Sequence, residues 1–425
     1  MLDSVVAPQL FIPTIKQDQA LALFCKHKEI LLEGGSRSGK TFIIVFAIIH
    51  RMIKYPKSRH LSVRKHFAHA KTSLWYDTIP KVIEVCFPDI EFKFNKQDWF
   101  IETTNGSTYW IGGLDDKDRI EKILGNEYGT IHINEASQTS WKGYEMLKTR
   151  LNPVKPMKGF MVSDYNPPSI HHWGYMLFHN STNPESKEIV NNKKRYAYLQ
   201  MNPQDNIKNL SDDYIENLES LSESQRKRFL EGKYSDGSQF ALWKWDWIIN
   251  NRISGQLPDF SRIVIGVDPA VSNSETADDT GIMVVGELKG EYYVIDDCTY
   301  SGEVTGWARQ VCQLYKKYEC DRVIGENNQG GDLVEANIRN FNRNIPYTGV
   351  RATRGKYTRA EPIAELYRQN KVHHCAEFSA LEEEMTTWEA NSGMKSPDRM
   401  DALVWAIAYL SGSYSYTGNV KVTGI

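Results

Sequence analysis

The chain has 425 residues, of which 41% are hydrophobic and 24% charged, with a formal net charge of −2. These values exclude general disorder, and the near-neutral charge excludes a polycation that coats nucleic acid along its whole length. The apolar runs fall short of the roughly 18 residues that span a bilayer, the six cysteines form no CxxC pair, and the start MLDSVVAPQLF lacks the features of a signal peptide. We therefore expect a cytoplasmic protein of two or three domains, without disulfides or a zinc knuckle.

The first half of the chain alternates short apolar runs with helical patterns. The runs that predict strands are 28–34, 60–65, 128–134 and 158–164. A helical pattern at 41–53 follows the first of these strands. Strands separated by helices favour an α/β domain with a largely parallel sheet, which we place at 1–192.

The string GGSRSGKT lies between the first strand and that helix and fits the P-loop pattern. Its residues are Gly34, Gly35, Ser36, Arg37, Ser38, Gly39, Lys40 and Thr41. Glycines let backbone amides close around phosphate oxygens, Lys40 offers a positive charge to the β and γ phosphates, and Thr41 is a ligand type for Mg²⁺. The motif predicts an ATP and Mg²⁺ site in a RecA/ASCE-like ATPase domain.

About ninety residues later, the strand YGTIHIN ends in Asn134 and is followed by Glu135. A Walker B motif normally places Asp and Glu at these two positions. Glu135 can polarise the water that attacks the γ phosphate, whereas neutral Asn134 can only orient a water on the metal. The predicted site therefore lacks one negative charge. The alternative is a buried strand that happens to end in Asn-Glu.

The second half of the chain has a different pattern. Residues 193–258 are polar, helical and rich in tryptophan, which predicts a helical lid and linker. Three strand patterns between 261 and 300 predict an antiparallel meander, and alternating helices and strands follow it as far as Tyr409. This order favours an RNase H-like domain at 259–411, with a short tail at 412–425.

Three carboxylates stand at matching places in these elements. Asp268 and Glu326 each end a predicted strand, and Asp401 lies on an amphipathic helix with Asp398 one turn earlier on the same face. Carboxylates that converge in this way can hold two Mg²⁺ or Mn²⁺ ions for phosphodiester cleavage.

Over nearly its whole length the chain resembles the large terminase subunits of tailed phages. The strings that carry the resemblance are GGSRSGKT, INEAS, SDYNPPS, VDPA, DDTGI, GENNQGG and SPDRMDAL. The resemblance implies a P-loop ATPase domain followed by an RNase H-like nuclease domain. It also implies ATP-driven translocation of double-stranded DNA into a procapsid and metal-dependent endonucleolytic cutting of concatemeric DNA.

The resemblance further assigns roles to individual residues of the ATPase half. Gln17 would contact adenine, with Gln19 as the neighbouring alternative. Asn166 would belong to a motif that couples hydrolysis to movement, and Arg37 would clamp phosphate. Arg119, or second Lys122, would complete the site of a neighbouring subunit in a ring.

In the nuclease half the resemblance adds an auxiliary metal ligand and a basic patch. Asp278 or Asp279 would assist the metal site, as would Asp398. Lys356 and Arg359 would contact the DNA backbone, which positions a duplex without reading its sequence.

The partners implied are double-stranded DNA, a portal ring, a small terminase subunit and further copies of the chain, with no membrane. We expect the protein in the host cytoplasm and transiently on the procapsid, but not in the mature virion. Two alternatives stand beside this interpretation. One is a helicase-like ATPase whose second half only binds DNA, and the other is an assembly adaptor with a degenerate ATP site.

Overall fold

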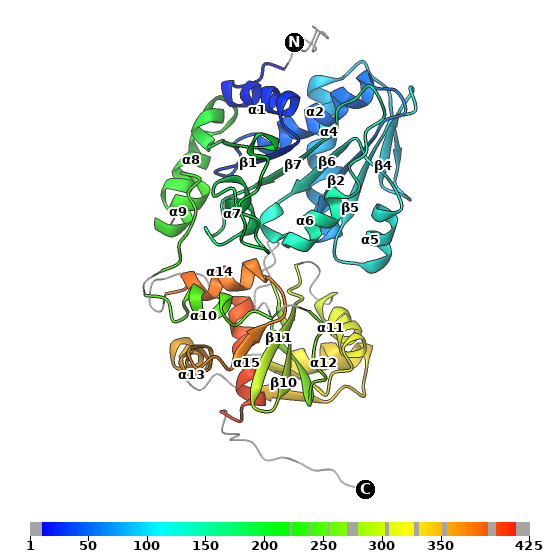
Figure 1. Cartoon of the computed structure of the whole chain (residues 1–425). Coiled ribbons are helices and arrows are strands. Elements are labelled where there is room, and N and C mark those ends of the chain that lie inside the picture. Colours follow the sequence, from blue (N-terminus) through cyan, green and yellow to red (C-terminus); the bar gives the residue numbers. More distant parts are fainter. Residues whose placement is uncertain are drawn as a thin grey trace. The chain divides into compact units, whose positions relative to one another are not determined.

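The computed structural model describes residues 11–221, 223–238, 240–253, 255–269, 279–301, 306–326, 331–350, 355–389 and 397–413. The chain forms two compact units, Met1–Asp236 and Gly237–Ile425, each built around one sheet with helices on both faces (Figure 1). Within the described ranges, every helix is too short or too polar to cross a bilayer.

The first unit contains an eight-stranded sheet in the order β3-β4-β5-β2-β6-β7-β1-β8. All neighbours from β5 to β8 in this order are parallel, and β3 and β4 form an antiparallel edge. The strands are β1 (Glu29–Glu33), β2 (Arg59–Arg64), β3 (Phe92–Asn95), β4 (Phe100–Thr103), β5 (Thr108–Gly113), β6 (Thr130–Asn134), β7 (Phe160–Tyr165) and β8 (Tyr196–Gln200). The four strands and the helix that the sequence predicted in this half are confirmed.

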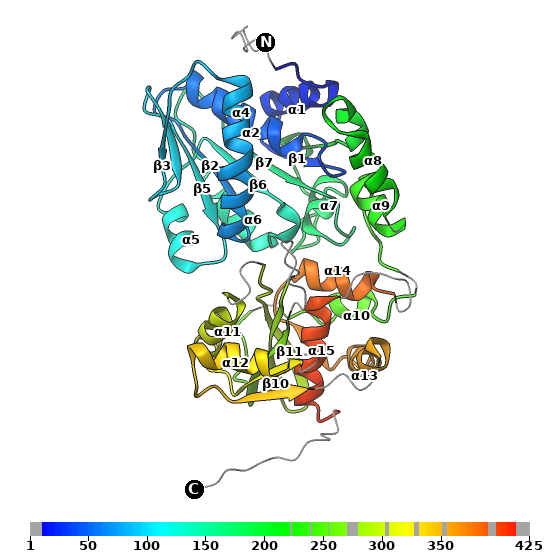
Figure 2. The ribbon, with the colours of Figure 1, turned by 180° about the vertical axis from the view of Figure 1, so that it is seen from behind.

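Helices cover both faces of this sheet. One face carries α1 (Ile15–Lys26), α2 (Lys40–Lys54), α3 (Phe67–Ala70), the π-helical turn Lys71–Thr78 and α4 (Ile79–Cys86). Figure 2 shows α2 and α4 in front of the strands. The other face carries α5 (Lys117–Leu124), α6 (Trp141–Lys148) and α7 (Trp173–Phe178).

Helices cover both faces of the sheet, which explains why its central strands are continuously apolar. Polar residues interrupt this pattern on the α2 face. In β1, Ile30 and Leu32 pack under α2 while Leu31 packs on the opposite face. In β6 and β7 the positions that share the α2 face end in polar residues instead, and Asn134 and Asp164 are both buried. Buried polar side chains need partners, so this end of the sheet is specialised.

The predicted lid segment 193–258 is not helical throughout. After a 3-10 turn at Lys193–Arg195 comes strand β8, whose pattern YAYLQ gives little sign of an edge strand because its side chains are only partly buried. Helices α8 (Asp212–Glu219), α9 (Glu223–Phe229) and α10 (Trp245–Ile249) follow. The first two belong to the first unit and α10 to the second. The lid boundaries stay a prediction.

The second unit contains a six-stranded sheet in the order β13-β12-β9-β10-β11-β14. The predicted meander is confirmed, because β10 pairs antiparallel with both β9 and β11. The strands are β9 (Arg262–Asp268), β10 (Gly281–Leu288), β11 (Glu291–Asp297), β12 (Arg322–Glu326), β13 (Tyr347–Val350) and β14 (Val372–His374). The short β14, parallel to β11, was not predicted.

Two layers of helices enclose this second sheet. One face packs against α10, α13 (Lys356–Arg368), α14 (Ser379–Thr387) and α15 (Asp398–Leu410). The other packs against α11 (Gly306–Lys317) and α12 (Gly331–Phe341). Asp268, Glu326 and Asp401 come from β9, β12 and α15, as predicted.

Helix α15 (red in Figure 1) lies directly on β9 and β10 because glycines face it. A Cβ at Gly266 would be 2.1 Å from the carbonyl oxygen of Ala402, and one at Gly281 would be 2.0 Å from that of Asp398. Only glycine permits this approach. It places the first turns of α15 beside the end of β9, where Asp268 stands.

We expect Gly266→Ala to lower the free energy of unfolding by about 1–3 kcal/mol, because the added methyl group must push α15 away from β9. Thermal unfolding of the full chain measures the change. Gly355→Ala is the matched control, since a Cβ there meets nothing within 4 Å and φ is −56°. Equal melting temperatures for the two variants would contradict this account of the packing.

Candidate functional site

The P-loop joins β1 to the first residue of α2. Gly34 and Gly39 have φ of 129° and 84°, conformations that glycine adopts without strain. A Cβ at Gly34 would also be 2.1 Å from the carbonyl oxygen of Met201. The loop therefore folds as a tight glycine turn at a helix N-terminus, which is a ready site for phosphate.

Lys40 is folded back onto its own loop. Its ammonium Nζ donates to the carbonyl oxygens of Gly35 at 2.6 Å and Gly34 at 3.1 Å, and to Ser38 Oγ at 3.0 Å. The side chain is 7% exposed, and burial lowers the pKa of Lys40 to about 8 although nearby carboxylates oppose the shift. A phosphate that replaced these neutral acceptors would restore a full counter-charge.

The predicted Walker B pair, Asn134 and Glu135, is linked to the P-loop by Asp164, which was not among the site residues predicted from the sequence. Asp164, near the end of β7, accepts hydrogen bonds from Thr41 Oγ1 at 2.5 Å and from Asn134 Nδ2 at 3.0 Å. It also accepts from His132 Nε2 and from the backbone amide of Glu135, both at 3.2 Å. Burial acts to raise the pKa of Asp164, but His132 and the hydrogen bonds outweigh it and hold the pKa at about 2.

Glu135 has an unusual backbone. Its φ and ψ are both 50°, in the left-handed region that few residues other than glycine adopt, and its side chain is half-buried. The hydrogen bond from its amide to Asp164 helps to hold this conformation. Such strained positions concentrate at functional sites.

Two further predicted residues lie against the P-loop. Gln17 is buried, caps α1 with Thr14, and its Nε2 donates to the carbonyl oxygen of Gly39 at 3.4 Å, whereas Gln19 is exposed. Asn166 accepts from Lys40 Nζ at 3.4 Å and donates to Ser36 Oγ at 3.3 Å. The structure thus brings the adenine and coupling candidates to the loop.

The predicted arginines are both exposed. Arg37, in the loop, has a φ of 51° and lies over the ring of Tyr214 at 5.4 Å. Arg119, on α5, pairs with Asp115 at 3.3 Å and lies over Phe67. Helix α5 contacts β5, four strands from β1 in the sheet, roughly 19 Å at the usual strand spacing. Arg119 therefore cannot reach the P-loop of its own chain.

In the second unit, the three predicted carboxylates share the α15 face of the sheet. Asp268 and Glu326 end neighbouring parallel strands, and Asp401 is 2% exposed on the helix that packs against them. Burial raises the pKa of Asp268 well above its ordinary value, and the charges of Asp401 and Glu326 add to the shift. The carboxylates therefore repel one another and favour a cation between them.

Two basic side chains provide that positive charge. Lys356 Nζ lies 2.5 Å from one oxygen of Asp401, and Arg359 lies 3.6 Å from the other. Glu326 accepts a hydrogen bond from Trp405 Nε1 at 3.2 Å. The predicted DNA-contacting residues are thus turned into the carboxylate centre.

The donor chemistry of this centre fits a hard divalent cation, because it consists of carboxylate oxygens. Among the described residues, however, no three such side chains lie close enough together to share a metal ion. Lys356 takes the position of a counter-ion instead. Release of Asp401 by Lys356 would be the condition for metal binding.

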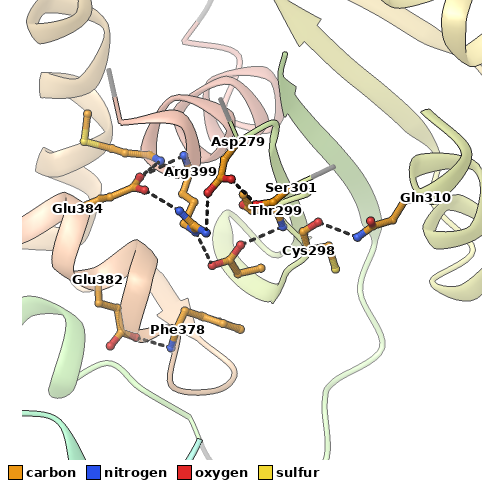
Figure 3. A network of polar contacts seen from close by, with 11 residues as sticks. Asp279, Cys298, Thr299, Ser301, Gln310, Phe378, Glu382, Glu384 and Arg399 are labelled. Carbon is orange, nitrogen blue, oxygen red and sulfur yellow. Dashed lines mark hydrogen bonds and ion pairs between the residues drawn. The ribbon is translucent and has the colours of Figure 1, made fainter. Parts of the chain in front are cut away.

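The auxiliary candidates lie at the same end of the sheet. Figure 3 shows Asp279 between Ser301 and Arg399, with a distance of 3.4 Å to the guanidinium. Arg399 also pairs with Glu384 at 2.9 Å, and burial raises the pKa of Glu384 to about 7 although Arg399 opposes the shift. Asp278 lies outside the described residues. Asp398 opens α15, and its charge acts on Asp268.

Two family models match the chain. The one described as "Phage terminase large subunit" matches residues 26–231, and the one described as "Terminase RNaseH-like domain" matches residues 265–410. No protein among curated sequences matches.

Several solved structures are similar at low identity. The large terminase of a thermophilic bacteriophage is 14% identical, with 95% of this chain and 99% of that chain covered and a TM-score of 0.48. The HK97 bacteriophage large terminase is 9% identical, with 95% and 96% covered and a TM-score of 0.42. The ATPase domain of the Thermus phage P74-26 large terminase is 13% identical, with 53% and 95% covered and a TM-score of 0.39.

We expect ADP binding to take up a proton at Lys40. With a pKa of about 8 in the free protein, roughly half of the lysines are neutral at pH 8, and the phosphates favour the charged form. Uptake should grow, and ADP affinity should fall, as the pH rises through 8. Calorimetry in two buffers of different ionisation enthalpy measures the uptake, and a zero value across this range would contradict the burial of Lys40.

Proposed function

The chain belongs to the phage large terminase subunits, carrying their ATPase domain and RNase H-like nuclease domain in that order, and from this we propose that it hydrolyses ATP to drive double-stranded DNA into a procapsid. The same chain would cut concatemeric DNA with its second unit. The observation that carries the proposal is the convergence of Lys40, Thr41 and Glu135 around one buried carboxylate at the P-loop.

The roles in hydrolysis follow from this convergence. Lys40 exchanges its loop carbonyl partners for the β and γ phosphates, and Thr41 offers its hydroxyl to Mg²⁺. Mg²⁺ held there would supply Lewis-acid stabilisation of the charge that develops on the phosphates. Glu135 stands next to the P-loop with a half-buried carboxylate and orients the attacking water.

Binding and coupling depend on the residues that touch the loop from outside it. Gln17 presents its amide beside Gly39 and recognises the adenine base. Asn166 contacts both Lys40 and Ser36. A change in the hydrogen-bond partners of Lys40 would therefore act directly on the segment that follows β7. This contact is the first step by which hydrolysis would move the rest of the ATPase domain.

The position of Arg119 supports the proposed ring of subunits. Helix α5 contacts β5, which is four strands from β1, so we assign Arg119 to the nucleotide of another subunit. Within its own chain, Arg119 pairs with Asp115. Arg37, exposed within the loop, is suited to clamp phosphate oxygens of its own nucleotide.

The second unit would cut DNA with Asp268, Glu326 and Asp401 holding Mg²⁺ or Mn²⁺. Such ions activate water and stabilise the leaving oxygen. Lys356 and Arg359 pair with Asp401, and the phosphates of a duplex would offer them alternative partners. A domain that only binds DNA has no need of acidic side chains at the ends of two neighbouring strands and on the helix that packs against them, which argues against the helicase-like alternative.

The proposed partners are a portal ring, a small terminase subunit and double-stranded DNA. The proposed location is the host cytoplasm, with transient docking on the procapsid and absence from the mature virion. These proposals rest on family membership.

We expect Lys40→Ala to lower ATPase activity by about a hundredfold or more and to leave nuclease activity unchanged, because the two chemistries use separate units. Asp268→Ala should show the reverse. ATP hydrolysis and Mn²⁺-dependent plasmid cutting are measured on each full-length variant. Lys117→Ala, an exposed lysine 3.9 Å from Glu121, is the matched control. Loss of both activities in either folded variant would contradict the separation.

The trans role of Arg119 predicts complementation between two inactive proteins. We expect Arg119→Ala and Glu135→Ala each to lack ATPase activity in the assembled ring, and a mixture to recover part of it, since one interface then holds both intact groups. Lys117→Ala, on the same helix and paired with Glu121 at 3.9 Å, is the control. No recovery at any mixing ratio of folded proteins would speak against a trans arginine.

A further inference from the structure

The Walker B position of this chain carries no charge. P-loop ATPases hold Mg²⁺ with the Ser or Thr of the loop and with an aspartate at the end of the Walker B strand. Here that strand is β6, and its last residue is Asn134. An amide attracts a divalent cation far less than a carboxylate does in a partly dry site. The negative charge beside the metal must therefore come from another residue, or the site has none.

The nearest candidate stands on the adjacent strand. Asn134 of β6 and Asp164 of β7 are direct register partners in the parallel sheet, and both side chains are on the α2 face. Asp164 Oδ2 lies 2.5 Å from Thr41 Oγ1, the hydroxyl that the P-loop offers to a metal. Asn134 Nδ2 is farther from that hydroxyl, at 3.4 Å.

We propose that Asp164 on β7, and not the residue at the end of β6, supplies the carboxylate of the Mg²⁺–nucleotide site. The inference rests on the proposed ATPase function and concerns this chain's own donor set. Asp164 is a positioning residue that acts on the metal through Thr41 and the waters around it.

The hydrogen bonds of Asp164 indicate that β6 and β7 have exchanged roles. Strand β7 carries the carboxylate, and β6 carries side chains that donate to it. Its Oδ1 accepts from Asn134 Nδ2 at 3.0 Å, from His132 Nε2 and from the amide of Glu135. Asn134 is therefore a donor that steadies the carboxylate on the next strand. An aspartate at position 134 would bring two carboxylates to hydrogen-bonding distance, and like charges that close cannot both ionise without cost.

A buried chain of hydrogen bonds fixes the position of this carboxylate. His132 Nδ1 meets Ser62 Oγ at 2.8 Å, and Ser62 Oγ meets the hydroxyl of Tyr109 at 2.6 Å. These residues come from β6, β2 and β5, all on the α2 face, and all three are fully buried. Such partners orient a charged side chain and are costly to remove.

The exchange places the metal-site charge on the same strand end as the coupling residue. Asp164 binds Thr41, and Asn166, two residues later, binds Lys40. The two P-loop side chains proposed to act on the nucleotide and its metal are thus tied to one short segment. A conventional Walker B aspartate would tie Thr41 to β6 instead.

The test is a charge swap between the two strands. Four full-length proteins are compared: wild type, Asp164→Asn, Asn134→Asp and the double variant Asn134→Asp/Asp164→Asn. Calorimetry gives the affinity for ATPγS with Mg²⁺ and with EDTA, and the ratio of the two affinities is the Mg²⁺ gain. This ratio reports on the metal site and not on turnover.

We expect Asp164→Asn to reduce the Mg²⁺ gain by about tenfold or more. Asn134→Asp alone should also reduce it, because the two carboxylates repel, and the double variant should recover most of it. A merely structural role for Asp164 would move the melting temperature of the variants without this recovery.

Two results would overturn the inference. One is an undiminished Mg²⁺ gain in folded Asp164→Asn, and the other is a larger gain in Asn134→Asp, which would mean that the site lacks charge. If Asp164→Asn does not fold, Asn134→Asp decides alone, since a smaller gain supports the inference. Failure of the wild type itself to bind ATPγS would instead overturn the proposed ATPase function.

Discussion

Asp164 is 2% exposed and yet charged, because donors from three elements converge on it. An unpaired buried carboxylate costs several kcal/mol, whereas each hydrogen bond to a charged group contributes about 1.5–3 kcal/mol. The donors of Thr41, Asn134, His132 and the amide of Glu135 together outweigh that cost. The carboxylate thereby joins the start of α2 to the ends of β6 and β7, and the ATPase site takes its geometry from this junction.

The nuclease centre depends on a different constraint, the approach of a helix backbone to a sheet. Glycines at 266 and 281 let α15 lie on β9 and β10, and Asp401 then stands over the strand end that carries Asp268. Here the carboxylates lie close enough to raise the pKa of Asp268, and their partners include Lys356 and the indole of Trp405. One centre is held by neutral and imidazole donors, whereas the other pairs its carboxylates with basic side chains and offers oxygen ligands that suit a divalent cation.

Much of this arrangement follows from the sequence. Apolar runs bounded by glycines and carboxylates predicted the parallel sheet, the meander, the P-loop and the three strand-end and helix carboxylates, because backbone pattern and turn chemistry are local. The missed strands are β3, β4, β5, β8 and β14, because short and partly buried strands carry little periodicity. Asp164 was missed for a different reason. Its importance comes from register with Asn134 across two strands thirty residues apart, and no spacing rule within one strand shows it. Its position two residues before Asn166 was the only local sign.

With Glu135 as one carboxylate of the ATP site, Asp164 on β7 would be the other. The most direct measurement is a crystal structure of the chain with Mg²⁺ and ATPγS. We expect Thr41 to ligate the metal, Lys40 to leave the carbonyl oxygens of Gly34 and Gly35 for the phosphates, and the carboxylate of Asp164 to remain within hydrogen-bonding reach of the metal's water shell. A metal held at the P-loop with Asp164 turned away from both Thr41 and that shell would contradict the account.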